Sequence, residues 1–187
     1  MQLTDIEILE RFRNPESRNF AFNQLVRKYQ QKIYWHIRKM VIDHDDANDL
    51  TQEVFIKVWE GLDTFKGNSQ LYTWLYRIAT NECLNFLAKK RRRFLLPIHD
   101  VETELLEKLE QNVAQPDGGF TGDEVALKLQ KALLTLPEKQ RLVFNMKYFD
   151  DLKYEDIAEI TGTSVGALKA SYHHAVTKIE KILNNED

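Results

Sequence analysis

Apolar side chains recur at steps of three and four residues along almost the whole sequence, and this spacing constrains the fold more than any other feature. Residues with this spacing share one face of an α-helix, and that face must be buried against another element. No segment shows the alternation of apolar and polar residues that a half-buried strand needs. We therefore predict an all-α protein. The clearest stripe consists of Phe22, Leu25, Val26, Tyr29, Ile33, Ile37 and Met40.

Two further long helices follow this stripe. The second has its apolar stripe at residues 47–62 and is preceded by Asp43, Asp45 and Asp46, which suit the cap and first turn of a helix. The loop at residues 63–69 is rich in Gly, Asn and Ser, which are typical of turns. The third predicted helix, at about residues 70–93, ends in the basic run KKRRR. Three helices of this length can bury their apolar stripes against one another.

The helical pattern is interrupted once, and the interruption predicts two domains. Residues 94–122 contain prolines, the turn signal DGG and the acidic stretch VETELLEKLEQN, which we interpret as a short helix in a flexible linker. The domains are then residues 1–93 and 123–187. In the second domain the sequence YEDIAEI, the turn TGTS and the sequence VGALKASYHHAVTKIEKIL have the pattern of a helix-turn-helix.

The net charge of −3 conceals a strong difference between segments. Residues 18–93 hold 14 Lys or Arg and 8 Asp or Glu, whereas residues 94–122 hold 1 and 6, and residues 123–187 hold 9 and 11. A basic domain attracts phosphates, so the first domain is the first candidate for binding nucleic acid. We also hypothesise that the acidic segment packs on the basic domain through salt-sensitive contacts.

Several classes of protein and site are not expected. No apolar run is long enough for a transmembrane helix and the N-terminus lacks a signal-peptide pattern, so we expect a cytoplasmic protein without membrane insertion. Cys83 is the single cysteine, and the neighbours His173 and His174 point about 100° apart on a helix, so we expect no metal and no cofactor. We also find no nucleophile motif and no Gly-rich phosphate loop, which argues against an enzyme.

The third predicted helix combines aromatic and basic residues in LYTWLYRIATNECLNFLAKKRRR. Aromatic rings stack on any unpaired base while Lys and Arg follow the phosphates, so this combination favours binding of single-stranded DNA. The alternative is that Tyr72, Trp74 and Tyr76 fill the core, because Trp and Tyr dominate helical packing. Both interpretations can hold for different rings.

The last predicted helix has the form of a recognition helix. Its apolar face consists of Val165, Leu168, Tyr172, Ala175, Ile179 and Ile182, and Ser164 is placed to cap its N-terminus. The small residues that remain outside this face would let the helix approach the major groove closely. An ordinary helical hairpin is the alternative, since this pattern alone does not distinguish the two.

These patterns resemble the sigma factors of bacterial RNA polymerase, specifically the extracytoplasmic-function (ECF) group that retains regions two and four. The stretch similar to region two is DANDLTQEVFIKVWEGLDTFKGNSQLYTWLYRIATNECLNFL. The stretch similar to region four is LPEKQRLVFNMKYFDDLKYEDIAEITGTSVGALKASYHHAVTKI. The resemblance covers nearly the whole chain, and two long matches in the right order carry more weight than either motif alone.

The resemblance implies roles for individual residues of the first domain. The second helix would dock on the coiled coil of the polymerase β′ subunit through Asp49, Gln52 and Glu53. The loop from Phe65 to Gln70 would capture a base flipped from the non-template strand of the minus-ten element, and Asn81 would help line that pocket, because an amide can both donate to and accept from a base edge. The residues implied in binding this element are Phe65, Lys66, Asn68, Ser69, Arg77, Asn81, Asn85 and Lys89.

The resemblance further implies that the second domain reads the minus-thirty-five element and contacts the polymerase β flap. Many relatives carry several arginines in the recognition helix, whereas Lys169 is the clear cation here, so phosphate attraction should be weaker. The acidic linker would pass through the polymerase channel, and an anti-sigma partner is expected. The residues implied in binding the minus-thirty-five element are Ser164, Lys169, Ala170, Ser171, His173, His174 and Lys178.

One alternative is a self-sufficient transcriptional regulator with a sensory first domain and a DNA-binding second domain. The discriminator is whether binding to DNA requires polymerase, which the resemblance implies. A second alternative is an enzyme such as a nuclease, but no paired carboxylates accompany a metal motif.

Overall fold

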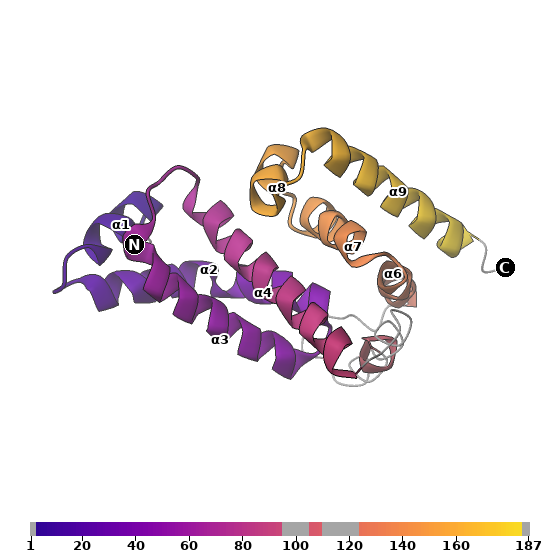
Figure 1. Ribbon diagram of the computed structural model, residues 1–187, viewed down its shortest axis with the longest axis horizontal. Coiled ribbons are helices and arrows are strands. Elements are labelled where there is room, and N and C mark those ends of the chain that lie inside the picture. The colour runs from indigo at the N-terminus through magenta and orange to yellow at the C-terminus, as the bar shows by residue number, and fades with distance from the viewer. Residues whose placement is uncertain (1–2, 95–104, 110–123, 185–187) are drawn as a thin grey trace.

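The computed structural model describes residues 3–94, 105–109 and 124–184. The regular structure among these residues is helical with no strand, which confirms the all-α prediction. Figure 1 shows the helices arranged as two bodies that lie against each other. The helices are α1 (Asp5–Phe12), α2 (Arg18–Val41), α3 (His44–Gly61), α4 (Leu71–Phe94), α6 (Glu124–Leu134), α7 (Glu138–Phe144), α8 (Tyr154–Thr161) and α9 (Val165–Asn184).

In the first body α2, α3 and α4 pack against one another, and α1 packs on α2 (Figure 1). The predicted stripe of α2 forms the core, since Leu25, Ile33 and Ile37 are fully buried. The periodicity did not predict α1, although its start has a capping box. Thr4 accepts a hydrogen bond from the Glu7 backbone, and the Glu7 carboxylate accepts one from the Thr4 backbone.

The junction between α2 and α3 is tight and strained. Ile42 ends α2 with φ of 66°, a conformation that β-branched residues rarely adopt. Asp43 then caps α3, and its carboxylate accepts a hydrogen bond from the backbone of Asp46 at 2.9 Å, as the sequence predicted. The chain therefore passes from α2 to α3 through Ile42 and Asp43 alone.

The second body contains α6, α7, α8 and α9. After α7 the chain continues as a short π-helix, η2 (Asn145–Phe149), and Asp151 follows with φ of 50°. Gly162 ends α8 in the left-handed conformation, and Ser164 accepts a hydrogen bond from the Ala167 backbone at the start of α9. The predicted helix-turn-helix is confirmed, together with its Ser164 cap.

The two bodies share one apolar cluster. Helix α8 packs on α4 (Figure 1), and Leu142, Met146 and Ile157 join the core residues of the first body in a continuous set of buried side chains. The free energy gained by burying these side chains therefore depends on the contact between the bodies.

Residues 105–109 are the described part of the predicted linker, and they are helical. Leu105 and Leu109 are buried against Ile42 and Leu134, which belong to different bodies. The Lys108 ammonium lies 2.9 Å from Asp43 and 3.4 Å from Asp46. This part of the linker does contact the first domain, as hypothesised. Its ion pairs have the opposite sense to the one expected, because they join a cation of the linker to acids of the domain.

Candidate nucleic-acid and partner interface

The outer face of α3 presents the predicted polymerase-binding residues to solvent. Asp49, Gln52 and Glu53 are exposed, and Ile56 on the same face is 58% exposed although it is apolar. An exposed apolar side chain among acids is suited to a partner helix that brings both cations and apolar groups.

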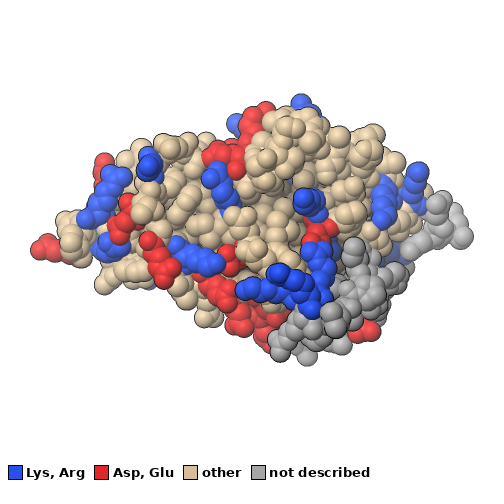
Figure 2. All heavy atoms as spheres, viewed as in Figure 1, with Lys and Arg blue, Asp and Glu red and all other residues tan. Residues whose placement is uncertain are grey.

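A groove of about 170 Å³ runs between α3 and α4. Asp49 and Glu53 line it from α3, while Asn85 and Lys89 line it from α4. The structure thus brings two residues predicted to bind polymerase together with two predicted to bind DNA. In Figure 2 acidic and basic side chains lie side by side along this edge of the molecule, so the basic charge of the first domain forms no uniform face there.

The row of polar residues on α4 is divided between two neighbours. Asn81 is exposed, and Asn85 and Lys89 face the groove beside α3. Arg77, one helical turn before Asn81, is directed to the other body, where its guanidinium lies 3.4 Å from the carboxylate of Glu159 on α8. The spacing of four residues predicted one continuous face, but the neighbours differ along it.

The loop before α4 is anchored by an aromatic contact. Phe65 is only 9% exposed, and its ring centroid lies 5.2 Å from that of Trp74. Lys66 and Asn68 are exposed, and Ser69 is partly exposed. In this arrangement Phe65 positions the loop, while its polar neighbours are accessible to a ligand.

The predicted recognition helix α9 buries its apolar face and exposes most of its candidate DNA-binding residues. Ser164, Lys169, Ala170, His173, His174 and Lys178 are exposed, and Ser171 is partly exposed. The Lys169 ammonium lies 5.7 Å from the ring centroid of Tyr154, and Lys178 donates a hydrogen bond to the Thr135 carbonyl at 2.5 Å. Lys178 would have to exchange this internal bond for a phosphate.

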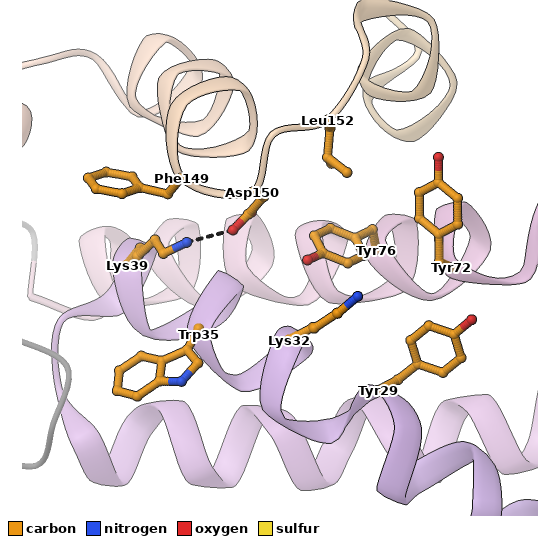
Figure 3. Close-up of a pocket in the computed structure, with 9 residues that line it drawn as sticks. All are labelled: Tyr29, Lys32, Trp35, Lys39, Tyr72, Tyr76, Phe149, Asp150 and Leu152. Carbon is orange, nitrogen blue, oxygen red and sulfur yellow. Dashed lines mark hydrogen bonds and ion pairs between the residues drawn. The ribbon is translucent and has the colours of Figure 1, made fainter. Parts of the chain in front are cut away.

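A cavity of about 640 Å³ separates part of the two bodies. Figure 3 shows that α2 and α4 line it on one side and the end of η2 on the other. Tyr76 is buried, and burial together with a hydrogen bond to Asp156 raises the pKa of Tyr72 to about 12. Of the three aromatic residues of α4 that could either fill the core or stack on bases, Tyr76 fills the core, while Tyr72 and Trp74 are partly exposed.

Asp150 forms a polar cluster with α2 at the edge of this cavity, which sequence reasoning missed. Its carboxylate lies 2.5 Å from the Lys39 ammonium and 3.3 Å from Nδ1 of His36, whose Nε2 lies 3.0 Å from the Thr80 hydroxyl. Burial raises the pKa of Asp150, but the hydrogen bonds and charges of His36 and Lys39 outweigh it, and the pKa lies below its ordinary value. No local signal could have found this cluster, because Asp150 lies more than a hundred residues from His36 and Lys39 in the sequence.

Within the described residues, no group of three or more His, Cys, Asp or Glu side chains is arranged to hold a metal ion. The same residues include no helix long and apolar enough to cross a membrane.

Comparisons with known proteins agree with the two-body architecture. The family model for sigma-70 region 2 matches residues 25–93, and the model for sigma-70 region 4 matches residues 126–179. The RNA polymerase sigma-H factor of Pseudomonas aeruginosa is 36% identical over 97% of this chain and 95% of its own length. The ECF RNA polymerase sigma-E factor of Escherichia coli K12 is 34% identical over 96% and 94%.

Two solved structures share the fold. The sigma factor RpoE of Bartonella quintana, in complex with the anti-sigma factor NepR, has a TM-score of 0.66 at 24% identity and covers 89% of this chain and 98% of its own. CnrH, in complex with the cytosolic domain of CnrY, has a TM-score of 0.67 at 20% identity and covers 97% of each chain.

Proposed function

The chain belongs to the ECF group of the sigma-70 family of RNA polymerase sigma factors, and from this premise we propose which of its surfaces binds polymerase and which binds promoter DNA. Members of the family are DNA-binding factors for transcription initiation, so the protein is a sigma factor and not an enzyme. The observation that carries this conclusion is the presence of both regions, in order, in a chain similar to ECF sigma factors along nearly its whole length.

Asp49, Gln52 and Glu53 bind the coiled coil of the β′ subunit in this proposal. They form an exposed acidic and amide surface on one helix, with Ile56 as an apolar centre. A rim of charge around an apolar centre is the usual anatomy of a protein interface.

Asn81 and the loop at residues 65–70 read the opened minus-ten element. The exposed amide of Asn81 can pair with a base edge, and Lys66 and Asn68 extend from a loop that Phe65 anchors. Flipping a base costs a few kcal/mol, which hydrogen bonds and stacking in the pocket must offset. Arg77, Asn85 and Lys89 complete this surface in the polymerase-bound state.

Helix α9 reads the minus-thirty-five element while the second domain contacts the β flap. The exposed small residues at the capped end of the helix support close approach to DNA. Since Lys169 is its clear cation, we expect α9 to bind DNA weakly unless polymerase holds it in place.

An anti-sigma factor is the expected regulatory partner, because the structural neighbour RpoE of Bartonella quintana is a sigma factor in complex with an anti-sigma factor. The protein acts in the cytoplasm, where polymerase and promoters are found. We propose domain boundaries at residues 93 and 123, with the linker between them.

Transcription in vitro with purified core polymerase on a library of genomic fragments tests the function. We expect transcripts that start at a defined class of promoter and require both the protein and core enzyme. Sequence-specific binding to promoter DNA by the free protein, without any core-dependent transcription, would instead support the self-sufficient regulator.

A further inference from the structure

We infer that the cavity between the two bodies is a binding site for a small aromatic monoanion, a molecule with a planar apolar ring system and one carboxylate or sulfonate group. The cavity volume of about 640 Å³ lies within the range of about 300–1,000 Å³ that is usual for small-molecule sites. Such a site goes beyond the proposed function, because it requires neither polymerase nor promoter DNA.

The walls of the cavity are rich in aromatic side chains. Rings from both bodies line it, namely Tyr29, Trp35, Tyr72, Tyr76 and Phe149 (Figure 3). Trp35, Tyr72 and Phe149 are partly exposed, so these rings retain apolar surface that a ligand can cover. An aromatic ligand would remove this surface and its own from water, and this burial is the main source of affinity in small-molecule sites.

The charged side chains at the cavity leave one positive charge without a partner. Lys32, Lys39 and Asp150 line the cavity, and the Lys39 ammonium is paired with the Asp150 carboxylate at 2.5 Å. Lys32 forms no ion pair and no hydrogen bond within the described residues. Figure 3 shows its ammonium group directed from α2 into the space between the two bodies. Lys32 is therefore the cation that favours a ligand with a single negative charge.

A buried hydroxyl group without a partner also lines the cavity. Tyr76 is only 5% exposed, and its hydroxyl forms no hydrogen bond within the part of the chain that the structure describes. Burial raises the pKa of Tyr76, so the hydroxyl keeps its proton and can donate. Figure 3 shows it on the side of the ring that faces the ammonium groups of Lys32 and Lys39. Because a buried donor without an acceptor is costly, an anionic group that accepts from Tyr76 would stabilise the site.

These features together define the charge and the shape of the ligand. A neutral aromatic compound would cover the rings but leave the Tyr76 hydroxyl without an acceptor and Lys32 without a counter-charge. A dianion such as a phosphate monoester would exceed the net charge of +1 that the described lining residues carry, and it would add repulsion from Asp150. A planar ring system with one negative charge satisfies both the walls and the polar groups.

The test uses two probes that share a ring system and differ in charge. Anilinonaphthalene sulfonate is an aromatic monoanion, and phenylnaphthylamine has the same rings without the sulfonate. Titration calorimetry on the full chain measures the Kd and the stoichiometry for each probe. Near-ultraviolet circular dichroism checks that every variant keeps its tertiary packing, because the anionic probe also binds loosely packed proteins.

The variants change one feature of the site at a time. Lys32→Met removes the cation and keeps an unbranched apolar stem, and Tyr76→Phe removes only the hydroxyl. Leu152→Trp adds bulk at a residue that lines the cavity, without a change of charge. Lys181→Met is the matched control, because Lys181 is exposed near the end of α9 and is not among the residues that line the cavity.

We expect one anionic probe to bind per chain with a Kd of about 10–100 µM. Lys32→Met should weaken its binding by about two- to fivefold and Tyr76→Phe by about tenfold, whereas Lys181→Met should not change it. The neutral probe should bind more weakly and be indifferent to Lys32→Met, and Leu152→Trp should abolish binding of both probes. The inference would be overturned by absence of binding at millimolar concentration of the anionic probe, by an affinity in Lys32→Met or Tyr76→Phe equal to that of Lys181→Met, or by unchanged binding in Leu152→Trp.

Discussion

In the proposed function, replacement of Asn81 by alanine should impair promoter opening and leave folding and polymerase binding unchanged. The Asn81 side chain is exposed on α4, so its loss leaves no cavity and no unpaired group. Surface substitutions of this kind change the free energy of unfolding by about 0.5 kcal/mol or less, and alanine is the better helix former. The stability of the variant should therefore match that of the original protein.

The functional loss should be much larger than this. A base contact by an amide with good geometry contributes about 1–3 kcal/mol of discrimination, which corresponds to about 5- to 150-fold in the population of open complex. Binding to core polymerase should be unchanged, because Asn81 lies outside the face formed by Asp49, Gln52 and Glu53. Asn81→Ala is thus expected to form holoenzyme normally but to open promoters poorly.

Permanganate reactivity of unpaired thymines measures the open complex, and pull-down of core polymerase measures assembly. Asn23→Ala is a matched control, since it removes another exposed helical asparagine, on α2, to which no role is assigned. Normal opening by Asn81→Ala, or an equal defect in Asn23→Ala, would refute the assignment of Asn81.

Three further predictions concern other parts of the molecule. The double reversal Asp49→Lys/Glu53→Lys should weaken pull-down of core polymerase, whereas Glu10→Lys on the exposed side of α1 should not; equal retention in both variants would contradict the α3 interface. Leu109→Ala should lower the free energy of unfolding by about 2–5 kcal/mol in urea titrations, because Leu109 is fully buried between the two bodies. A change below about 0.5 kcal/mol, as for a surface residue, would show that this packing is absent in solution. The pKa of Asp150 lies below its ordinary value of 3.8. Its contribution to stability is therefore complete above pH 3.8 and is lost as the pH falls through the lower pKa of the folded state. Asp150→Asn should flatten the decline of the free energy of unfolding over that pH range, and an unchanged decline would exclude this linkage.

Much of the fold could be predicted because its signals are local. The stripe of α2, the Asp43 cap of α3 and the Ser164 cap of α9 each depend on residues within one or two helical turns. Helix α1 could also have been predicted from the sequence, since the capping box of Thr4 and Glu7 spans only four consecutive residues.

The candidate site was predictable in its residue types and less so in their surroundings. The spacing of Arg77, Asn81, Asn85 and Lys89 placed them along one side of α4, but Arg77 meets α8 and the last two meet α3. Phe65 looked like a loop residue open to a base, yet it is buried on Trp74. Periodicity gives the direction of a side chain from its own helix, and it contains no information about which neighbour lies in that direction.

By itself the sequence determined that the chain is helical, where most helices begin and end, and that its two regions are those of a sigma factor, because these properties depend on short-range spacing and on motif order. Only the tertiary structure decided that the two bodies share a core and that Asp150 meets Lys39 and His36. Those partners lie 111 and 114 positions away from Asp150, and whether they meet depends on how two sets of helices pack on each other. That packing is set by the summed shape and charge of both surfaces, which no local pattern in the sequence records.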